Sequence, residues 1–143
     1  MHTYFETTVK FEKTAEEGKI VKVSQKNLVD ALSFTEAEAR IIKEMQPFIS
    51  GEFQVSAIKR YRVSELFWNE NGDKWFRAKV NFITLDEEKG VERKSPTTML
   101  VQACDIKEAR EGLVEGMKGS MADYEVESIT ETKIVDVFKY EAK

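Results

Sequence analysis

The stretch LSFTEAEARI, residues 32–41, decides the fold because it returns 72 positions later as CDIKEAREGL. In each copy a side-chain acceptor stands three residues before a glutamate, Ser33 before Glu36 and Asp105 before Glu108. This spacing is typical of a capping box, in which the two side chains satisfy backbone N–H groups at the start of a helix. We therefore interpret these carboxylates as helix caps and not as an acid–base pair.

The repeat extends to the segments on both sides of the helix. YFETTVKF, residues 4–11, is matched by WFRAKVNF, residues 75–82, and LVDA, residues 28–31, is matched by LVQA, residues 100–103. Alternate residues of the first pair are apolar, and a period of two predicts a strand with one buried face. The polar turns EKTAEEGK and TLDEEKG each contain a glycine and predict hairpins. Each half is thus expected to be strand, strand, helix, strand.

We predict an α+β fold in which a β-β-α-β unit is duplicated in tandem. The expected architecture is an antiparallel sheet of about six strands with two helices packed on it. The chain is expected to be a single domain, residues 1–143, made of two pseudo-symmetric halves, 1–70 and 71–143. Pro96 supplies no backbone donor, so its strand is expected to have an edge or a bulge there. The sequence leaves open whether the halves share one sheet or exchange strands.

Composition excludes several classes of protein. The 22 Lys and Arg against 26 Asp and Glu give a net charge of -4, which argues against nucleic acid as a partner of the whole surface. No run of residues is long and apolar enough for a membrane span or a signal peptide, so we expect a soluble, cytoplasmic protein without a membrane partner.

Catalytic groups are scarce in this sequence. His2 is the sole histidine and is expected to lie on the surface, which excludes a histidine-based triad or metal site. Cys104 is the sole cysteine, so the chain has no internal disulfide, and we expect its thiol to be buried. We predict no catalytic residue, no metal site and no cofactor, and the protein is not expected to be an enzyme.

The joint between the two copies, WNENGDKW, contains the turn signal Asn71-Gly72. A hairpin at this turn would place Trp68 opposite Trp75. One face of the hairpin would then carry basic groups and both tryptophans, as a site for an anionic, stackable ligand requires. The candidate ligand-binding residues are Arg60, Arg62, Trp68, Trp75, Arg77 and Lys79. A structural reading stays open, because cross-strand tryptophans stabilise hairpins and such a face can be buried in an oligomer.

Three strings, LVDALSFTEAEARIIKEMQPFISGEF, KVNFITLDEEKG and GMKGSMADYE, resemble a family of small proteins, about 150 residues long, of unknown function that occur in gut bacteria and their phages. The resemblance covers nearly the whole chain. It implies a setting in which phage genes are frequent, but it brings no activity and no site residues.

We expect a non-catalytic binding protein, phage-encoded in that setting. It would capture a small anionic, nucleotide-like ligand, or a host protein, through the basic sheet face with its two tryptophans. The alternative is a structural or assembly protein that self-associates through this exposed face. Under either hypothesis we expect a homo-oligomer.

Overall fold

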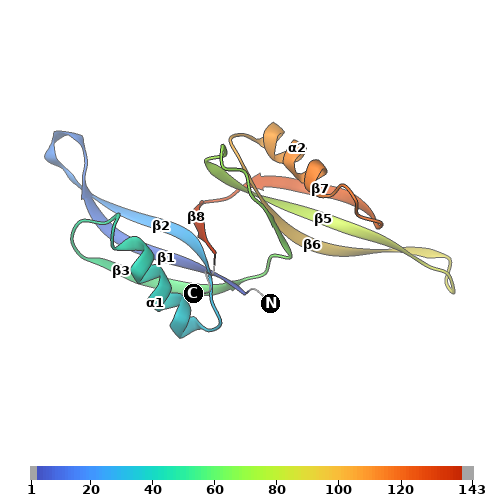
Figure 1. Cartoon of the computed structure of the whole chain (residues 1–143), viewed down its shortest axis with the longest axis horizontal. Coiled ribbons are helices and arrows are strands. Elements are labelled where there is room, and N and C mark those ends of the chain that lie inside the picture. Colours follow the sequence, from blue (N-terminus) through green and yellow to red (C-terminus); the bar gives the residue numbers. More distant parts are fainter. Residues whose placement is uncertain (1–2, 140–143) are drawn as a thin grey trace. The chain divides into compact units, whose positions relative to one another are not determined.

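The computed structural model of the chain describes residues 3–139, which form two compact units (Figure 1). Unit 1 comprises residues 3–62 together with 133–139, and unit 2 comprises residues 63–132. The chain therefore passes between the units twice, once after Arg62 and once after Thr132. Both passages come earlier in the sequence than the predicted ends of the two halves, residues 70 and 143. His2 lies outside the described residues.

The described part of unit 1 is a four-stranded sheet with one helix. Its elements are β1 (Tyr4–Thr14), β2 (Ile20–Asp30), α1 (Phe34–Met45), β3 (Phe53–Tyr61) and β8 (Ile134–Phe138), with a short 3₁₀ turn (Glu16–Gly18) between β1 and β2. The sheet order is β3-β1-β2-β8. β1 runs antiparallel to both of its neighbours, whereas β8 runs parallel to β2.

Unit 2 is also a four-stranded sheet with one helix. Its elements are β4 (Glu65–Phe67), β5 (Lys74–Asp86), β6 (Val91–Ala103), α2 (Ile106–Gly116) and β7 (Asp123–Glu131). The sheet order is β4-β6-β5-β7, in which β5 runs antiparallel to β6 and β7 and β4 runs parallel to β6. Among the described residues, no helix is long and apolar enough to cross a membrane.

The α+β class is confirmed, but the strands are arranged differently from the predicted antiparallel sheet of about six strands. The strand expected at the end of each half is divided in two, and its second piece joins the sheet of the other unit as a parallel edge strand. Packing explains this division. Phe67 of β4 packs against the core of unit 2, and Phe138 of β8 packs against the core of unit 1. Each short strand thus contributes an apolar side chain to the core of the unit that it joins.

The hairpin predicted at Asn71-Gly72 is wrong, because β6 lies between β4 and β5 and pairs with both. The turn itself is tight, since the N–H of Gly72 donates to the carbonyl of Asn69 at 2.9 Å. A Cβ on Gly72 would lie 2.6 Å from backbone atoms of Ala103 at the end of β6. The connection from β4 to β5 therefore passes close to β6 at a place where only glycine fits.

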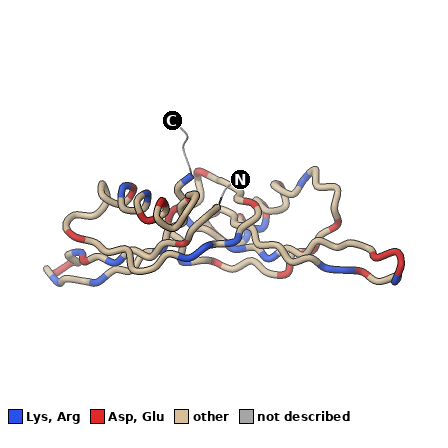
Figure 2. Tube along the Cα trace, turned by 90° about the horizontal axis from the view of Figure 1, so that it is seen from below, with Lys and Arg blue, Asp and Glu red and all other residues tan. Residues whose placement is uncertain are grey.

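The two long hairpins predicted from the polar turns, β1–β2 and β5–β6, are confirmed. The acidic residues 86–88 gather in the β5–β6 turn, at the right end of Figure 2. Pro96 of β6 lies opposite Asn81 of β5. β4 pairs only with residues 99–101, so within the described chain Pro96 has a neighbouring strand on one side only. This arrangement accounts for a proline inside a long strand.

The helix starts follow the repeated sequence stretch. Ser33 Oγ accepts a hydrogen bond from the N–H of Glu36 at 3.1 Å, and Asp105 Oδ1 accepts one from the N–H of Glu108 at 2.8 Å. Each bond satisfies a backbone donor that has no partner inside the helix. The prediction that Ser33 and Asp105 cap the helices is confirmed. The glutamates do not complete the capping boxes, because Glu36 Oε1 has no hydrogen-bond partner among the described residues and Glu108 Oε1 accepts from the N–H of Cys104, one residue before the cap.

Each helix packs on one face of the sheet of its own unit. The buried core residues are Phe5, Val9, Val29, Ala31, Ala37, Ile41, Met45 and Ile49 in unit 1, and Phe76, Ala78, Val80, Met99, Val101, Ala103, Ala109, Leu113 and Met117 in unit 2. The strand residues of these sets alternate along β1 and β5, as a period of two requires. The opposite face of each sheet carries exposed polar side chains but also buried apolar ones, Leu28 in unit 1 and Trp75 and Leu100 in unit 2.

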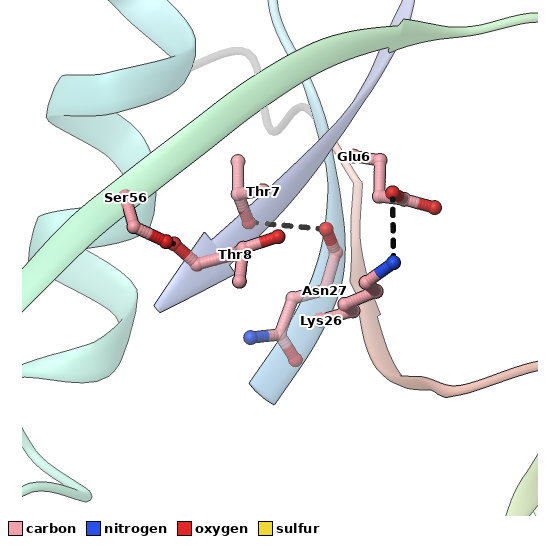
Figure 3. A network of polar contacts seen from close by, with 6 residues as sticks. All are labelled: Glu6, Thr7, Thr8, Lys26, Asn27 and Ser56. Atoms are coloured by element: carbon pink, nitrogen blue, oxygen red, sulfur yellow. Dashed lines mark hydrogen bonds and ion pairs between the residues drawn. The ribbon is translucent and has the colours of Figure 1, made fainter. Parts of the chain in front are cut away.

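A polar network crosses the central strands of unit 1 (Figure 3). Thr7 Oγ1 donates to the Asn27 carbonyl at 3.0 Å, Lys26 Nζ lies 3.6 Å from Glu6 Oε1, and Ser56 Oγ donates to the Thr8 carbonyl at 3.4 Å. The Asn27 side chain is fully buried, and its Oδ1 accepts from Gln25 Nε2 and from the N–H of Asp136, both at 3.2 Å. Asp136 belongs to β8, and the register between β2 and β8 shifts at Asn27. The side chain of Asn27 therefore accepts the hydrogen bond of the Asp136 N–H, which the register shift leaves without a backbone acceptor.

Replacing Asn27 by alanine is expected to lower the free energy of unfolding by about 2 kcal/mol, because the N–H of Asp136 loses its acceptor and a buried space is left. Urea denaturation measures the loss, and amide hydrogen exchange at Asp136 should accelerate. Gln54→Ala, an exposed amide removed from β3, is the control and should change stability by less than about 0.5 kcal/mol. Equal stability of the two variants would contradict this role for Asn27.

Candidate functional site

The face of the unit 2 sheet that points away from α2 carries three of the six predicted site residues, and a fourth, Trp68, contacts one of them. Trp75, Arg77, Lys79 and Asn81 alternate along β5 with the core residues that face the helix. The sequence therefore correctly predicts which side chains of β5 share a face. It does not predict the strands that flank this face, which are β6 and β7.

The two tryptophans contact one another although they are not hairpin partners. Their rings meet edge to face, with centroids 5.0 Å apart and an interplanar angle of 88°. Trp75 is 2% exposed, so its ring faces are not available to a ligand. Trp68 is 40% exposed and is the tryptophan that a ligand can reach.

Arg77 and Lys79 are exposed, and neither forms an ion pair with any described residue. The ladder places Thr130 of β7 and the buried Leu100 of β6 opposite Arg77, and it places Thr98 of β6 and Ser128 of β7 opposite Lys79. No carboxylate lies directly opposite either cation in this register. Two cations surrounded by three hydroxyl groups form a patch that can donate several hydrogen bonds to one anionic group.

A carboxylate pair ends the basic patch beyond Lys79. Asn81 Nδ2 lies 3.5 Å from both Glu125 Oε1 and Glu127 Oε2. Glu125 also accepts a hydrogen bond from Lys94 at 2.7 Å, which lowers the pKa of Glu125 and raises the pKa of Lys94. The charge of Glu125 is thus engaged by Lys94, and the free cations are confined to the Arg77 end of the face.

Arg60 and Arg62 are not part of the unit 2 sheet, because both belong to unit 1. The guanidinium of Arg60 lies 5.9 Å from the ring centroid of Phe34 in α1, on the helix side of its sheet. The prediction that Arg60 shares a face with Arg77 rested on the hairpin, and it is wrong for the same reason. Arg62 is exposed at the end of unit 1.

Cys104 is exposed, which corrects the expectation that its thiol is buried. The thiol contacts the carbonyl of Asn71 at 3.0 Å, and the N–H of Cys104 donates to Glu108 Oε1 at 3.2 Å. The residue therefore helps to join the β4–β5 connection to the start of α2. Within residues 3–139, no cluster of three or more His, Cys, Asp or Glu side chains is placed to hold a metal ion.

Two grooves in unit 1 are absent from the sequence prediction. The larger has a volume of about 890 Å³ and is lined by residues 10–14, 20, 22–24 and 50–54. Its lining has three lysines but also two glutamates, so its charge is mixed. The smaller, of about 540 Å³, lies between α1 and β3. Both combine segments that are far apart in the chain, and no local motif marks them.

Comparisons with known proteins give one match. A family model described as "Domain of unknown function (DUF4494)" matches residues 3–140. No curated protein and no solved structure matches the chain.

Proposed function

We propose that this chain, which belongs to the DUF4494 family, is a non-catalytic binding protein that captures a small anionic, nucleotide-like ligand on the outer sheet face of unit 2. The observation that carries the proposal is the pair of free cations, Arg77 and Lys79, with hydroxyl groups opposite them in the ladder. A phosphate group would accept hydrogen bonds from both cations and from the neighbouring hydroxyls.

The exposed part of Trp68 supports the choice of a nucleotide over a simple inorganic anion. Trp68 contacts Trp75, and Trp75 lies two residues before Arg77 on the same face of β5. A base would stack on Trp68 while its phosphates lie toward Arg77 and Lys79. The mixed charge of the larger groove in unit 1 makes it a weaker site for an anion than this face.

The proposal places the ligand on an open surface without catalytic groups. The ligand would therefore bind reversibly, and its affinity would fall with rising salt concentration, because salt screens the charges of Arg77 and Lys79. The gut-bacterial and phage setting implied by the sequence resemblance fits a protein that sequesters such a ligand. A host protein with an acidic surface is the other partner that this patch would accept.

Titration with adenine and guanine nucleotides at low protein concentration is expected to quench tryptophan fluorescence. Arg77→Ala and Lys79→Ala should each weaken binding by about tenfold, because each removes a charge-assisted hydrogen bond. Lys107→Ala removes an exposed lysine from α2 and is the control, for which we expect unchanged binding.

Two results would count against the proposal. Quenching that persists in the Arg77→Ala variant would place the ligand elsewhere. No response to any nucleotide, combined with self-association that Trp68→Ala abolishes, would favour assembly through the same sheet face.

A further inference from the structure

The groove between α1 and β3 in unit 1 is acidic at its rim and apolar at its floor. Glu38, Ile42 and Gln46 line one side, at a spacing of four residues that places them on one stripe of the helix surface. Phe53 and Val55 of β3 line the other side, together with residues 51 and 52. The apolar members are partly buried, so the floor is partly open to solvent.

The corresponding stripe of α2 in unit 2 begins with a basic residue where the stripe of α1 has an acidic one. The residues 72 positions after Glu38 and Ile42 are Arg110 and Val114 of α2, and the residue 72 positions after Gln46 is Lys118. Val114 is 46% exposed. The apolar position is kept in both units, while the charged position at the start of the stripe changes from acidic to basic.

The two opposite charges are both available for an external partner. Glu38 and Arg110 are exposed, and neither forms an ion pair within the part of the chain that the structure describes. Lys118 is already engaged, because its Nζ lies 2.7 Å from Glu115 Oε2. Arg110 is therefore the main free cation of this surface.

We propose that the α1–β3 groove of one copy of this chain binds the α2 surface of a second copy, with Glu38 of the first pairing with Arg110 of the second. Ile42 and Val114 would supply the apolar centre of the contact, and the ion pair would lie at its rim. The contact joins two different surfaces, so a dimer keeps a free α2 surface on one copy and a free groove on the other. Such a heterologous contact generates chains of copies unless it closes into a ring.

This contact is distinct from the proposed ligand site, because it uses the helix side of each unit and not the outer sheet face. It also differs from self-association through the tryptophan face. A small contact with one principal ion pair is weak, and it should form at high protein concentration and low salt.

Sedimentation velocity of the full chain over a range of concentrations tests the proposal. Wild-type protein is expected to form a concentration-dependent series of species. Glu38→Arg and Arg110→Glu should each weaken the association by at least about tenfold, since each places like charges together. The double variant Glu38→Arg/Arg110→Glu restores opposite charges and should associate again.

Mixing the two single variants gives the sharpest test. The intact groove of the Arg110→Glu protein can bind the intact α2 surface of the Glu38→Arg protein, and the two substituted surfaces that remain also carry opposite charges. The mixture is therefore expected to associate, although neither variant associates by itself. Glu16→Arg and Lys89→Glu make the same changes in charge at exposed positions in the β1–β2 and β5–β6 turns, away from both surfaces, and should associate as the wild type does.

Three outcomes would overturn the proposal. The wild-type protein could remain a monomer at every concentration. The double variant could fail to associate although its thermal unfolding is unchanged. Association could instead be abolished by Trp68→Ala, which would assign it to the sheet face. None of these results depends on nucleotide binding, so the proposed function is tested separately.

Discussion

Phe5→Ala is expected to lower the free energy of unfolding by about 4 kcal/mol, the largest effect of any single change considered for this protein. Phe5 is fully buried in unit 1, where it packs with Val29, Ala31 and Ala37. Its ring also meets Phe34 edge to face at a centroid distance of 4.9 Å. Alanine would remove these contacts and leave a cavity between the sheet and α1. Urea denaturation followed by circular dichroism measures the change.

Phe48→Ala is the matched control for this prediction. It makes the same chemical change in the same unit, but Phe48 is 76% exposed. Its replacement should alter the free energy of unfolding by less than about 0.5 kcal/mol. Similar losses in both variants would show that Phe5 does not occupy the core position described for β1.

Gly72→Ala is expected to lower the free energy of unfolding by about 3 kcal/mol. The new methyl group would lie 2.6 Å from the N and Cα atoms of Ala103, and backbone atoms cannot move aside as a side chain does. Either the β4–β5 connection or the end of β6 must shift. The emission of Trp68 and Trp75 should change as well, because these two residues lie on either side of the turn.

Gly112→Ala provides the comparison for Gly72→Ala. A Cβ on Gly112 would lie 3.2 Å from Val101 Cγ1, the end of a side chain, and Gly112 is inside α2, where alanine is favoured by about 1 kcal/mol. We therefore expect this variant to be close to the wild type in stability. If Gly72→Ala were equally well tolerated, the close approach of the connection to β6 would be contradicted.

The elements that depend on neighbouring residues were predicted correctly. The helix starts at Ser33 and Asp105 follow from acceptors and donors three residues apart, and the two long hairpins follow from alternating strands joined by glycine-containing turns. The position of Arg77 and Lys79 on one face of β5 follows from the same alternation. Each of these features is decided within a few residues of chain.

The predictions that failed concern the partner of a strand. The Asn71-Gly72 turn has the local sequence of a hairpin, yet β4 pairs with β6 across more than 30 residues of chain. The candidate site inherited this error, because it placed Arg60 and Arg77 on one sheet face, whereas β3 and β5 belong to different sheets. A turn motif specifies the direction of the chain but not which strand lies next to it.

The amino-acid sequence by itself determined the two helix starts, the two long hairpins and the alternating faces of β1 and β5. Only the tertiary structure decided that β4 and β8 join the sheets of the other units, that Trp75 is buried while Trp68 is not, and that Glu38 lines a groove. The physical reason is the range of the interactions. Periodicity and capping act between residues close in the chain, whereas the burial of Phe67 and Phe138 selects among strand partners that no local pattern distinguishes.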